Sequence, residues 1–274
     1  MDGFDPVTDE APSRLAQEDE ELEAEGRWAA GADPVTVPPR FVAGRALAPG
    51  EGAPGAAPTL VVATSRQGYR LLHAACPPAR REPLGALAVP GAPVRGVTAG
   101  PGGESSTCAA FRVAPDLSVA LVPPEVPAEA AAGATAALLG ALSPGRVVVA
   151  SQEAAPGGAL AGGEEGATYS VRTPAWAAPV PASCPPLPPG VPLSGVAAAA
   201  AAWCRARGVP ALVLTQPVSR PVPDSVAARA LARALADAVG DAGGLREAVE
   251  GAASRIASRE DRRGLGHASA TVYM

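Results

Sequence analysis

The sequence predicts an α/β protein, in which a layered sheet is flanked by helices and includes one antiparallel hairpin. Short apolar runs that suit buried strands alternate with longer segments of helical periodicity. Two of the strands are separated only by Ala114-Pro115-Asp116, which indicates a hairpin. Hydrophobic residues make up 47% of the 274 residues, which is enough to build a core. We place a single domain at residues 58–258.

Residues 1–57 are expected to form a disordered arm. Residues 18–25 are an acidic block, which is normally a solvated segment. Residues 38–55 are rich in proline and glycine and are typical of a linker.

The first βα unit is expected just after this arm. Residues 59–63 are continuously apolar, as in a buried strand. Ser65 can cap a following helix in which Tyr69, Leu72 and Cys76 share one face. His73 lies beside that face and is expected to be packed, because the only other histidine is the distant His267.

The hairpin and a second unit follow. Residues 107–113 and 117–122 are its two strands. Pro127 begins a helix that runs to about Leu142, and residues 146–150 form another buried strand. Residues 152–167 are rich in glycine but match neither the dinucleotide fingerprint nor the phosphate loop, so we expect a surface loop.

The best-defined unit is a helix, a turn and a strand. Ser194 is a suitable N-cap, and Gly208 stands where a C-terminal glycine belongs. An alanine-rich helix lies between them, and residues 211–215 form a short strand. The face of this helix that we expect to be buried carries Val196, Ala199, Ala200 and Trp203.

Two amphipathic helices end the ordered region. The first begins at Asp224 or Ser225, and its apolar face carries Ala228, Leu231, Leu235 and Val239. The second begins at Leu245, and its apolar face carries Leu245, Val249, Ala252, Ala253 and Ile256. Residues 259–274 are polar and aperiodic, so we expect a flexible tail.

Composition argues against several classes of protein. The net charge of −5 gives no support for nucleic-acid binding. The four cysteines form no C-x-x-C pair, which favours buried free thiols in a reducing compartment. No segment has the length and hydropathy of a membrane span, and the N-terminus has no signal-peptide pattern. We therefore expect a cytoplasmic protein, with the nucleus as an alternative.

No constellation of catalytic residues can be assembled from the sequence. There is no G-x-S-x-G motif, and nothing places a serine beside either histidine. We expect no catalytic residue, no metal site and no cofactor. A site assembled in space from distant residues is invisible at this level, so an enzyme remains an alternative.

Residues 184–235 and the end of the chain resemble a known family. A Cys-Pro-Pro-Leu approach leads into a small-residue helix that ends in Trp203-Cys204, followed by Val-Pro-Ala-Leu-Val-Leu at residues 209–214. The chain ends in a hydrophobic residue, a tyrosine and a terminal residue, Val272-Tyr273-Met274. Together these features resemble the first subunit of the eukaryotic proteasome assembly chaperone heterodimer. The acidic arm also resembles the N-terminal region of that subunit.

The resemblance implies a non-catalytic chaperone without a cofactor. It would pair with a related second subunit and bind the outer face of the proteasome α-subunit ring. Val272, Tyr273 and Met274 would be the partner-binding residues, entering a pocket between α subunits. Two alternatives stay open: an enzyme of the nucleoside hydrolase or phosphorylase type, and a general proteasome-binding adaptor.

Overall fold

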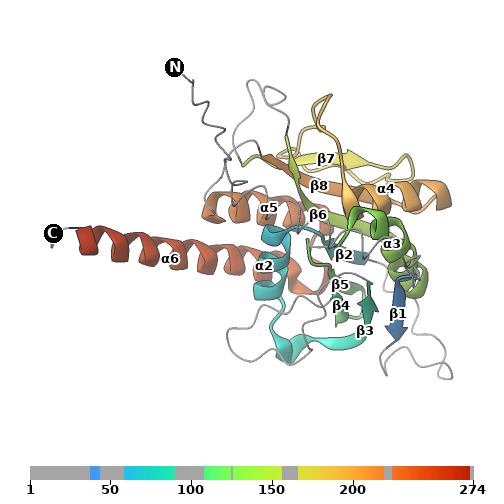
Figure 1. Cartoon of the computed structure of the whole chain (residues 1–274), viewed down its shortest axis with the longest axis horizontal. Helices are drawn as coiled ribbons and strands as arrows, with labels where there is room; N and C mark the ends of the chain where they lie inside the picture. Colours follow the sequence, from blue (N-terminus) through green and yellow to red (C-terminus); the bar gives the residue numbers. More distant parts are fainter. Residues whose placement is uncertain are drawn as a thin grey trace, which may run out of the picture. The chain divides into compact units, whose positions relative to one another are not determined.

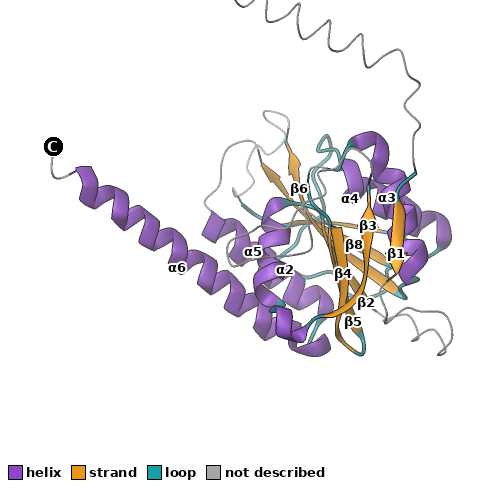
Figure 2. Ribbon diagram, turned by 60° about the horizontal axis from the view of Figure 1, so that its bottom comes forward, coloured by secondary structure: helices purple, strands orange, loops and turns teal. Residues whose placement is uncertain are grey.

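The computed structural model describes residues 38–43, 59–89, 108–124, 126–155, 166–218 and 224–271, with side chains as far as Glu260. All of them belong to one compact unit that begins at Pro38. A mixed sheet of eight strands lies between two layers of helices (Figures 1 and 2). The predicted fold class, an α/β sheet with helices on its faces, is confirmed.

The strands lie in the order β1-β3-β4-β5-β2-β6-β8-β7 across the sheet. Neighbours among β5, β2, β6 and β8 are parallel, and the remaining pairs are antiparallel. The parallel centre is buried on both faces, which explains its continuous apolar runs. The strands are β1 (Arg40–Ala43), β2 (Thr59–Ala63), β3 (Glu82–Ala88), β4 (Cys108–Ala114), β5 (Leu117–Leu121), β6 (Arg146–Ala154), β7 (Tyr169–Arg172) and β8 (Ala211–Val218).

Helices cover both faces of the sheet (Figure 2). Helices α2 (Arg66–Ala75), α5 (Asp224–Val239) and α6 (Leu245–Thr271) lie on one face. Helices α3 (Ala128–Leu142) and α4 (Gly195–Arg207) lie on the other. Because side chains alternate along a strand, Val61 belongs to the first core and Val62 to the second.

The first βα unit and the hairpin form as predicted. Ser65 is the N-cap of α2, and its Oγ accepts a hydrogen bond from the amide of Gly68 at 3.1 Å. Strands β4 and β5 pair antiparallel around the predicted turn. The turn therefore sets the register of the hairpin.

Strand β1 was not predicted, and it lies inside the expected arm. Strand β1 (Arg40–Ala43) pairs with β3 (Glu82–Ala88) at the edge of the sheet, so the expected limit of the arm at residue 57 is wrong for residues 40–43. A Cβ atom on Gly85 would lie 2.5 Å from the ring of Phe41 and from the carbonyl oxygen of Val42. The close approach of these two strands thus requires glycine at position 85. The acidic block at residues 18–25 lies outside the described residues.

Helix α4 has the predicted limits, but its buried face is shifted. Gly208 ends it with φ +68°, as expected of a C-terminal glycine. The buried residues are Val196, Ala197, Ala200 and Cys204. Trp203, which we expected in the core, is only partly buried. The guanidinium carbon of Arg207 lies over the indole ring of Trp203, 4.4 Å from the ring centre. In a helix made mostly of alanine, the apolar pattern does not fix the phase of the buried face.

Helix α6 buries four of the five predicted positions, with Ile256 only partly buried, and it ends later than predicted. Leu245, Val249, Ala252 and Ala253 are all buried against α5 and α2. The helix then continues to Thr271, so a tail beginning at residue 259 does not agree with the structure. Arginine, glutamate and alanine are good helix formers, and a helix in solvent needs no apolar face to continue.

The cysteine prediction is confirmed. Cys76, Cys108, Cys184 and Cys204 are all free and buried. Among the described helices, none combines the length and the apolar character that crossing a bilayer requires.

Candidate functional site

Helix α6 is the first candidate, because it carries the chain away from the domain. Its apolar face packs on α5 and α2, and among the side chains described, which end at Glu260, the last buried one is that of Ala257. Residues 261–271 then project past the other helices (Figures 1 and 2). At 1.5 Å per residue, these 11 residues extend over roughly 16 Å. We call them the projecting end of α6.

Glu260 fixes the base of this projecting end. Its Oε2 accepts a hydrogen bond from the backbone amide of Ser225 at 2.8 Å, in the first turn of α5. Hydrogen bonds from Ser225 hold the pKa of Glu260 below its ordinary value. The ionised carboxylate is therefore the form that binds the start of α5, where the helix dipole is positive.

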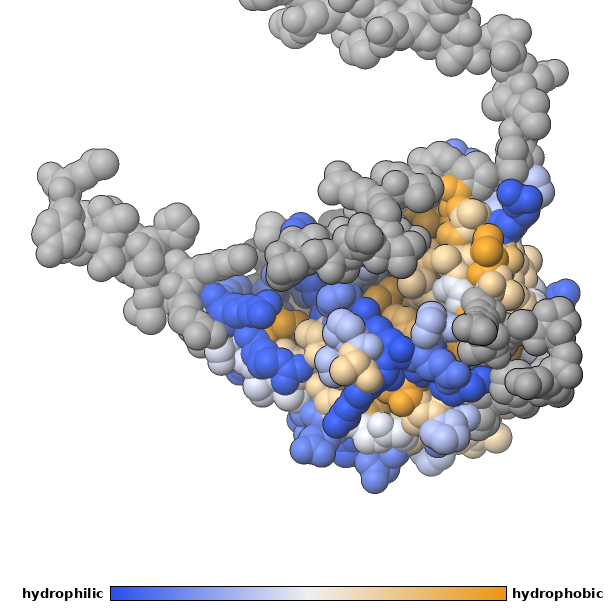
Figure 3. Space-filling model, turned by 90° about the horizontal axis from the view of Figure 1, so that it is seen from below, coloured by the Kyte–Doolittle hydropathy of each residue, from blue (hydrophilic) through white to orange (hydrophobic). Residues whose placement is uncertain are grey.

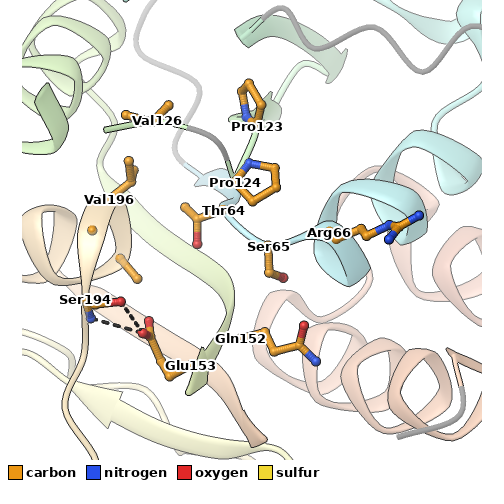
Figure 4. A pocket seen from close by; sticks show the side chains of 12 residues that line it. Thr64, Ser65, Arg66, Pro123, Pro124, Val126, Gln152, Glu153, Ser194 and Val196 are labelled. Atoms are coloured by element: carbon orange, nitrogen blue, oxygen red, sulfur yellow. Dashed lines mark hydrogen bonds between the residues drawn. The ribbon is translucent and has the colours of Figure 1, made fainter. Parts of the chain in front are cut away.

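A cavity of about 230 Å³ at the carboxyl ends of the parallel strands is the second candidate. The helices that follow the neighbouring strands β2 and β5 cover opposite faces of the sheet, so a crevice opens between the ends of these strands. Ligands of open α/β sheets bind in such crevices. Figure 4 shows the polar residues of the lining, which are Thr64, Ser65, Arg66, Gln152, Glu153 and Ser194.

Glu153 is the charged group buried in this cavity. Its side chain is 4% exposed, and its Oε2 accepts hydrogen bonds from Ser194 Oγ at 2.5 Å and from Ser194 N at 3.2 Å (Figure 4). Burial raises the pKa of Glu153, and the bonds from Ser194 oppose that shift. Ser194 is the N-cap residue of α4 as predicted, but its hydroxyl donates to Glu153 and does not cap the helix. Glu153 therefore supplies the negative charge at the start of α4.

Ser65, at the start of α2, is also engaged in hydrogen bonding. Its Oγ accepts from the amide of Gly68 in the first turn of α2. Thr64 Oγ1 donates to the carbonyl oxygen of Ala150 at 3.4 Å. The hydroxyl groups of Thr64, Ser65 and Ser194 in the lining therefore all have partners within the protein.

The thiols offer little nucleophilic character. Burial raises the pKa of Cys76 and of Cys204 to about 11, and that of Cys108 to about 12. At neutral pH these thiols are protonated, and the thiol is not the nucleophilic form. Within the ranges that the structure describes, no three His, Cys, Asp or Glu side chains are grouped so that they could hold a metal ion.

The structure brings only some of the residues singled out in the sequence to a site. Val272, Tyr273 and Met274 lie outside the described residues, directly after the projecting end of α6. His73 stacks on Tyr69 with ring centres 6.1 Å apart, as a packed histidine. Glu153 and Glu260 were missed as contact residues. Glu153 binds a helix start 41 residues away in sequence, and Glu260 binds one 35 residues away. No local sequence pattern signals such contacts.

Comparison of the sequence with known proteins gives no relative. No family model matches the chain, and no curated protein matches it. Any likeness must therefore be sought in the fold.

Solved structures do share this fold. PbaA from Pyrococcus furiosus, described as an archaeal homolog of proteasome-assembly chaperone, matches with a TM-score of 0.54 and 11% identity, over 86% of this chain and 100% of its own. PbaB from the same organism, described as an archaeal proteasome activator, matches with a TM-score of 0.54 and 10% identity, over 85% of this chain and 99% of its own. A protein of unknown function from Thermoplasma acidophilum matches with a TM-score of 0.53 and 15% identity, over 77% and 90% of the two chains. This chain has the fold of these archaeal proteins, two of which are an assembly-chaperone homologue and an activator of the proteasome.

Proposed function

We propose that this protein is a non-catalytic chaperone for assembly of the proteasome core particle. It binds the outer face of the α-subunit ring as one half of a heterodimer, and Val272, Tyr273 and Met274 are its contact residues. The fold likeness to PbaA and PbaB over nearly their whole length supports a proteasome-related role. The observation that carries the proposal is the projecting end of α6, which leads directly to this C-terminal motif.

The chemistry of the motif suits a pocket. A hydrophobic side chain that enters a pocket gains about 1.5–3 kcal/mol, and the ring of Tyr273 adds area and a hydroxyl group. The free carboxylate of Met274 can pair with a cation or with backbone amides, a known mode of terminal capture. Three residues alone bind weakly once their ordering entropy is subtracted. Useful affinity therefore needs the body of the protein or the partner's terminus to bind at the same time.

The direct test is α-ring binding by C-terminal variants. Tyr273→Ala, or deletion of the last three residues, should weaken binding to purified α rings by about tenfold or more, which corresponds to about 1.4 kcal/mol. Met274→Leu retains an apolar side chain and the terminal carboxylate and should bind as wild type does. The proposal fails if Tyr273→Ala binds α rings as tightly as wild type.

Heterodimer formation is tested by co-expression with the second assembly-chaperone subunit. Among the described side chains, the exposed large hydrophobic residues are Val42 at 59% and Val226 at 45%. On the face shown in Figure 3, apolar patches are interspersed with hydrophilic surface. We expect a stable one-to-one complex and poorer solubility of the chain alone. A soluble monomer that ignores this subunit in size-exclusion chromatography would contradict the heterodimer.

Co-purification separates this function from its two alternatives. A chaperone should recover immature α-ring intermediates from the cytoplasm or the nucleus. An adaptor should recover mature proteasomes. An enzyme of the nucleoside hydrolase or phosphorylase type should recover neither, and it would be expected to use the cavity around Glu153.

A further inference from the structure

Helix α6 closes both ends of helix α5. At the start of α5, Glu260 accepts the hydrogen bond from the amide of Ser225. At its end, Arg246 Nη2 donates to the carbonyl oxygen of Ala236 at 3.1 Å, and the same guanidinium bonds Asp237 Oδ1 at 3.3 Å. The amide of Ser225 is a main-chain donor of the first turn, which a helix leaves unpaired. The carbonyl oxygen of Ala236 also accepts from the amide of Gly240 at 3.0 Å, so Arg246 adds a second hydrogen bond there.

Helix α6 also contributes one contact to the end of α2, where Arg81 donates to the carbonyl oxygens of His73 and Cys76. Arg255 Nη2 donates to the carbonyl oxygen of Ala74 at 2.8 Å, in the last turn of α2. The signs agree with the helix dipole at all three ends, because the carboxylate lies at a positive start and each guanidinium lies at a negative end. One helix thus contributes Arg246, Arg255 and Glu260 to three ends of its two neighbours.

The start of α5, which Glu260 contacts, is also hydrogen-bonded to α2. Asp224, the first residue of α5, accepts from Arg70 Nη1 at 2.6 Å and from the side-chain amide of Gln67. Glu260 therefore binds a helix start that is itself hydrogen-bonded to α2. The contact of Glu260 with α5 and the contact of Arg255 with α2 together join α6 to both of these helices.

The spacing of the three contacts determines what they can hold. Arg246 and Glu260 are 14 residues apart, which is about 21 Å along a helix. Fixing a rod at points this far apart restricts both its tilt and its rotation. The contact of Glu260 lies at the last turn before the projecting end, where a small change in tilt displaces the tip most.

We propose that Arg246, Arg255 and Glu260 are positioning residues, which fix the direction of the projecting end of α6 and so present Val272, Tyr273 and Met274 to the α ring. This inference rests on the proposed function, because it concerns the same C-terminal site. A segment already held as a helix loses less conformational entropy on binding than a free tail. The fixed direction also sets the effective concentration of the motif at its pocket.

The ordinary alternative is that these contacts only stabilise the domain, and a distance measurement separates the two. Spin labels are placed on the full chain at Ser269→Cys, in the projecting end, and at Glu129→Cys, exposed on α3. The four native cysteines are buried and should not be labelled. We expect a narrow distance distribution in wild type that broadens at least twofold in Glu260→Ala. A broad distribution in wild type, or no change in the variant, overturns the inference.

Two variants control for charge and for simple loss of structure. Glu260→Gln keeps an oxygen that can accept from Ser225, so it should restore the narrow distribution. Glu250→Ala removes the same charge from an exposed position on the same helix and should change nothing. Thermal melting of each variant shows that the labelled domain is folded.

Binding then tests the link to the proposed function. Replacing residues 262–265 with four glycines should weaken α-ring binding about tenfold, because the helical connection becomes a flexible one. Replacing the same residues with four alanines keeps the helix and should leave binding within twofold of wild type. Equal binding of the two variants overturns the inference while leaving the proposed function intact. If wild type itself does not bind α rings, the proposed function fails, and the distance measurement still decides whether the three residues fix the projecting end.

Discussion

The two faces of the sheet close their helix ends in different ways. On the face of α2, α5 and α6, three of these ends are bound by side chains of α6, which are 10, 35 and 181 residues away in sequence. On the face of α3 and α4, the C-terminal ends close locally, at Ser143 with φ 42° and at Gly208. The helices of the first face are thus bonded to one another by side chains, whereas on the second face α4 is bound at its start by Glu153 of β6.

The packing of the two cores is alike. The first core combines large side chains of α5, such as Leu235, with alanines such as Ala232. The second core combines large side chains of α3, such as Leu138, with alanines of α4 such as Ala200. Removing a buried leucine and enlarging a buried alanine should therefore both lower the free energy of unfolding.

The largest expected effect is at Leu235. Leu235→Ala removes a fully buried side chain between α5 and the sheet and should lower the free energy of unfolding by about 3–4 kcal/mol. Chemical denaturation measures this loss. Val226→Ala, at an exposed position on the same helix, is the matched control and should cost about 0.5 kcal/mol or less. Equal losses in the two variants would contradict the tight core on this face.

The second effect is overpacking at Ala200. Ala200 is 2% exposed between α4 and the sheet, so Ala200→Leu should cost about 2 kcal/mol. Ala202→Leu places the same side chain on the exposed side of α4 and should be close to neutral. Denaturant midpoints decide the question. If Ala202→Leu proved the more damaging variant, the observed phase of α4 would be wrong.

The third effect is at Trp203. Because Trp203 is only partly buried, Trp203→Ala should cost about 1–2 kcal/mol, less than the loss expected of a core tryptophan. Part of that cost is the contact with Arg207, which is worth about 0.5–1 kcal/mol at an exposed site. Trp203→Phe keeps most of the ring contact and should recover over half of the loss. A loss of unfolding free energy above about 3 kcal/mol in Trp203→Ala would indicate that Trp203 is a core residue, as expected from the sequence.

The smallest effect is the pH dependence contributed by Glu153. Its folded pKa is raised above the ordinary 4.5, so the folded state binds this proton more tightly than the unfolded state does. This group therefore adds stability as the pH falls from neutral toward 4.5, and the gain is lost as the pH rises through the folded pKa. Glu153→Gln removes the titrating carboxyl group but keeps a side-chain oxygen that can accept from Ser194. The difference in stability between wild type and this variant should change over that pH window, as followed by denaturation at several pH values. A difference that stays constant with pH would contradict the buried position of this carboxylate.

The sequence predicts what depends on local patterns. Buried runs, a proline turn and the caps at Ser65 and Gly208 place most strands and helices within a few residues. Strand β3 is missed because Pro83 and Gly85 disfavour a strand, and tertiary pairing with β4 overrides them. The phase of α4 is missed because alanines on all sides leave no apolar stripe.

The candidate sites depend more on contacts across the fold. The projecting end of α6 follows a charged segment that has no apolar face, so its helical structure cannot be predicted from periodicity. Glu153 and Glu260 act on helix starts that only the folded chain brings near them. The C-terminal motif is the converse case, since its residues are recognised in sequence and the described structure ends just before them.

A pull-down from growing cells tests α-ring binding through the free C-terminus most directly. The protein is expressed with a tag at its N-terminus or at its C-terminus, and the recovered complexes are separated by native electrophoresis. We expect N-terminally tagged protein to recover immature α-ring intermediates together with a second chaperone subunit. C-terminally tagged protein should recover the subunit but not the α rings, because the tag displaces the free carboxylate of Met274. Equal recovery of α rings by both tagged proteins, or recovery by neither, would contradict α-ring binding through the C-terminus.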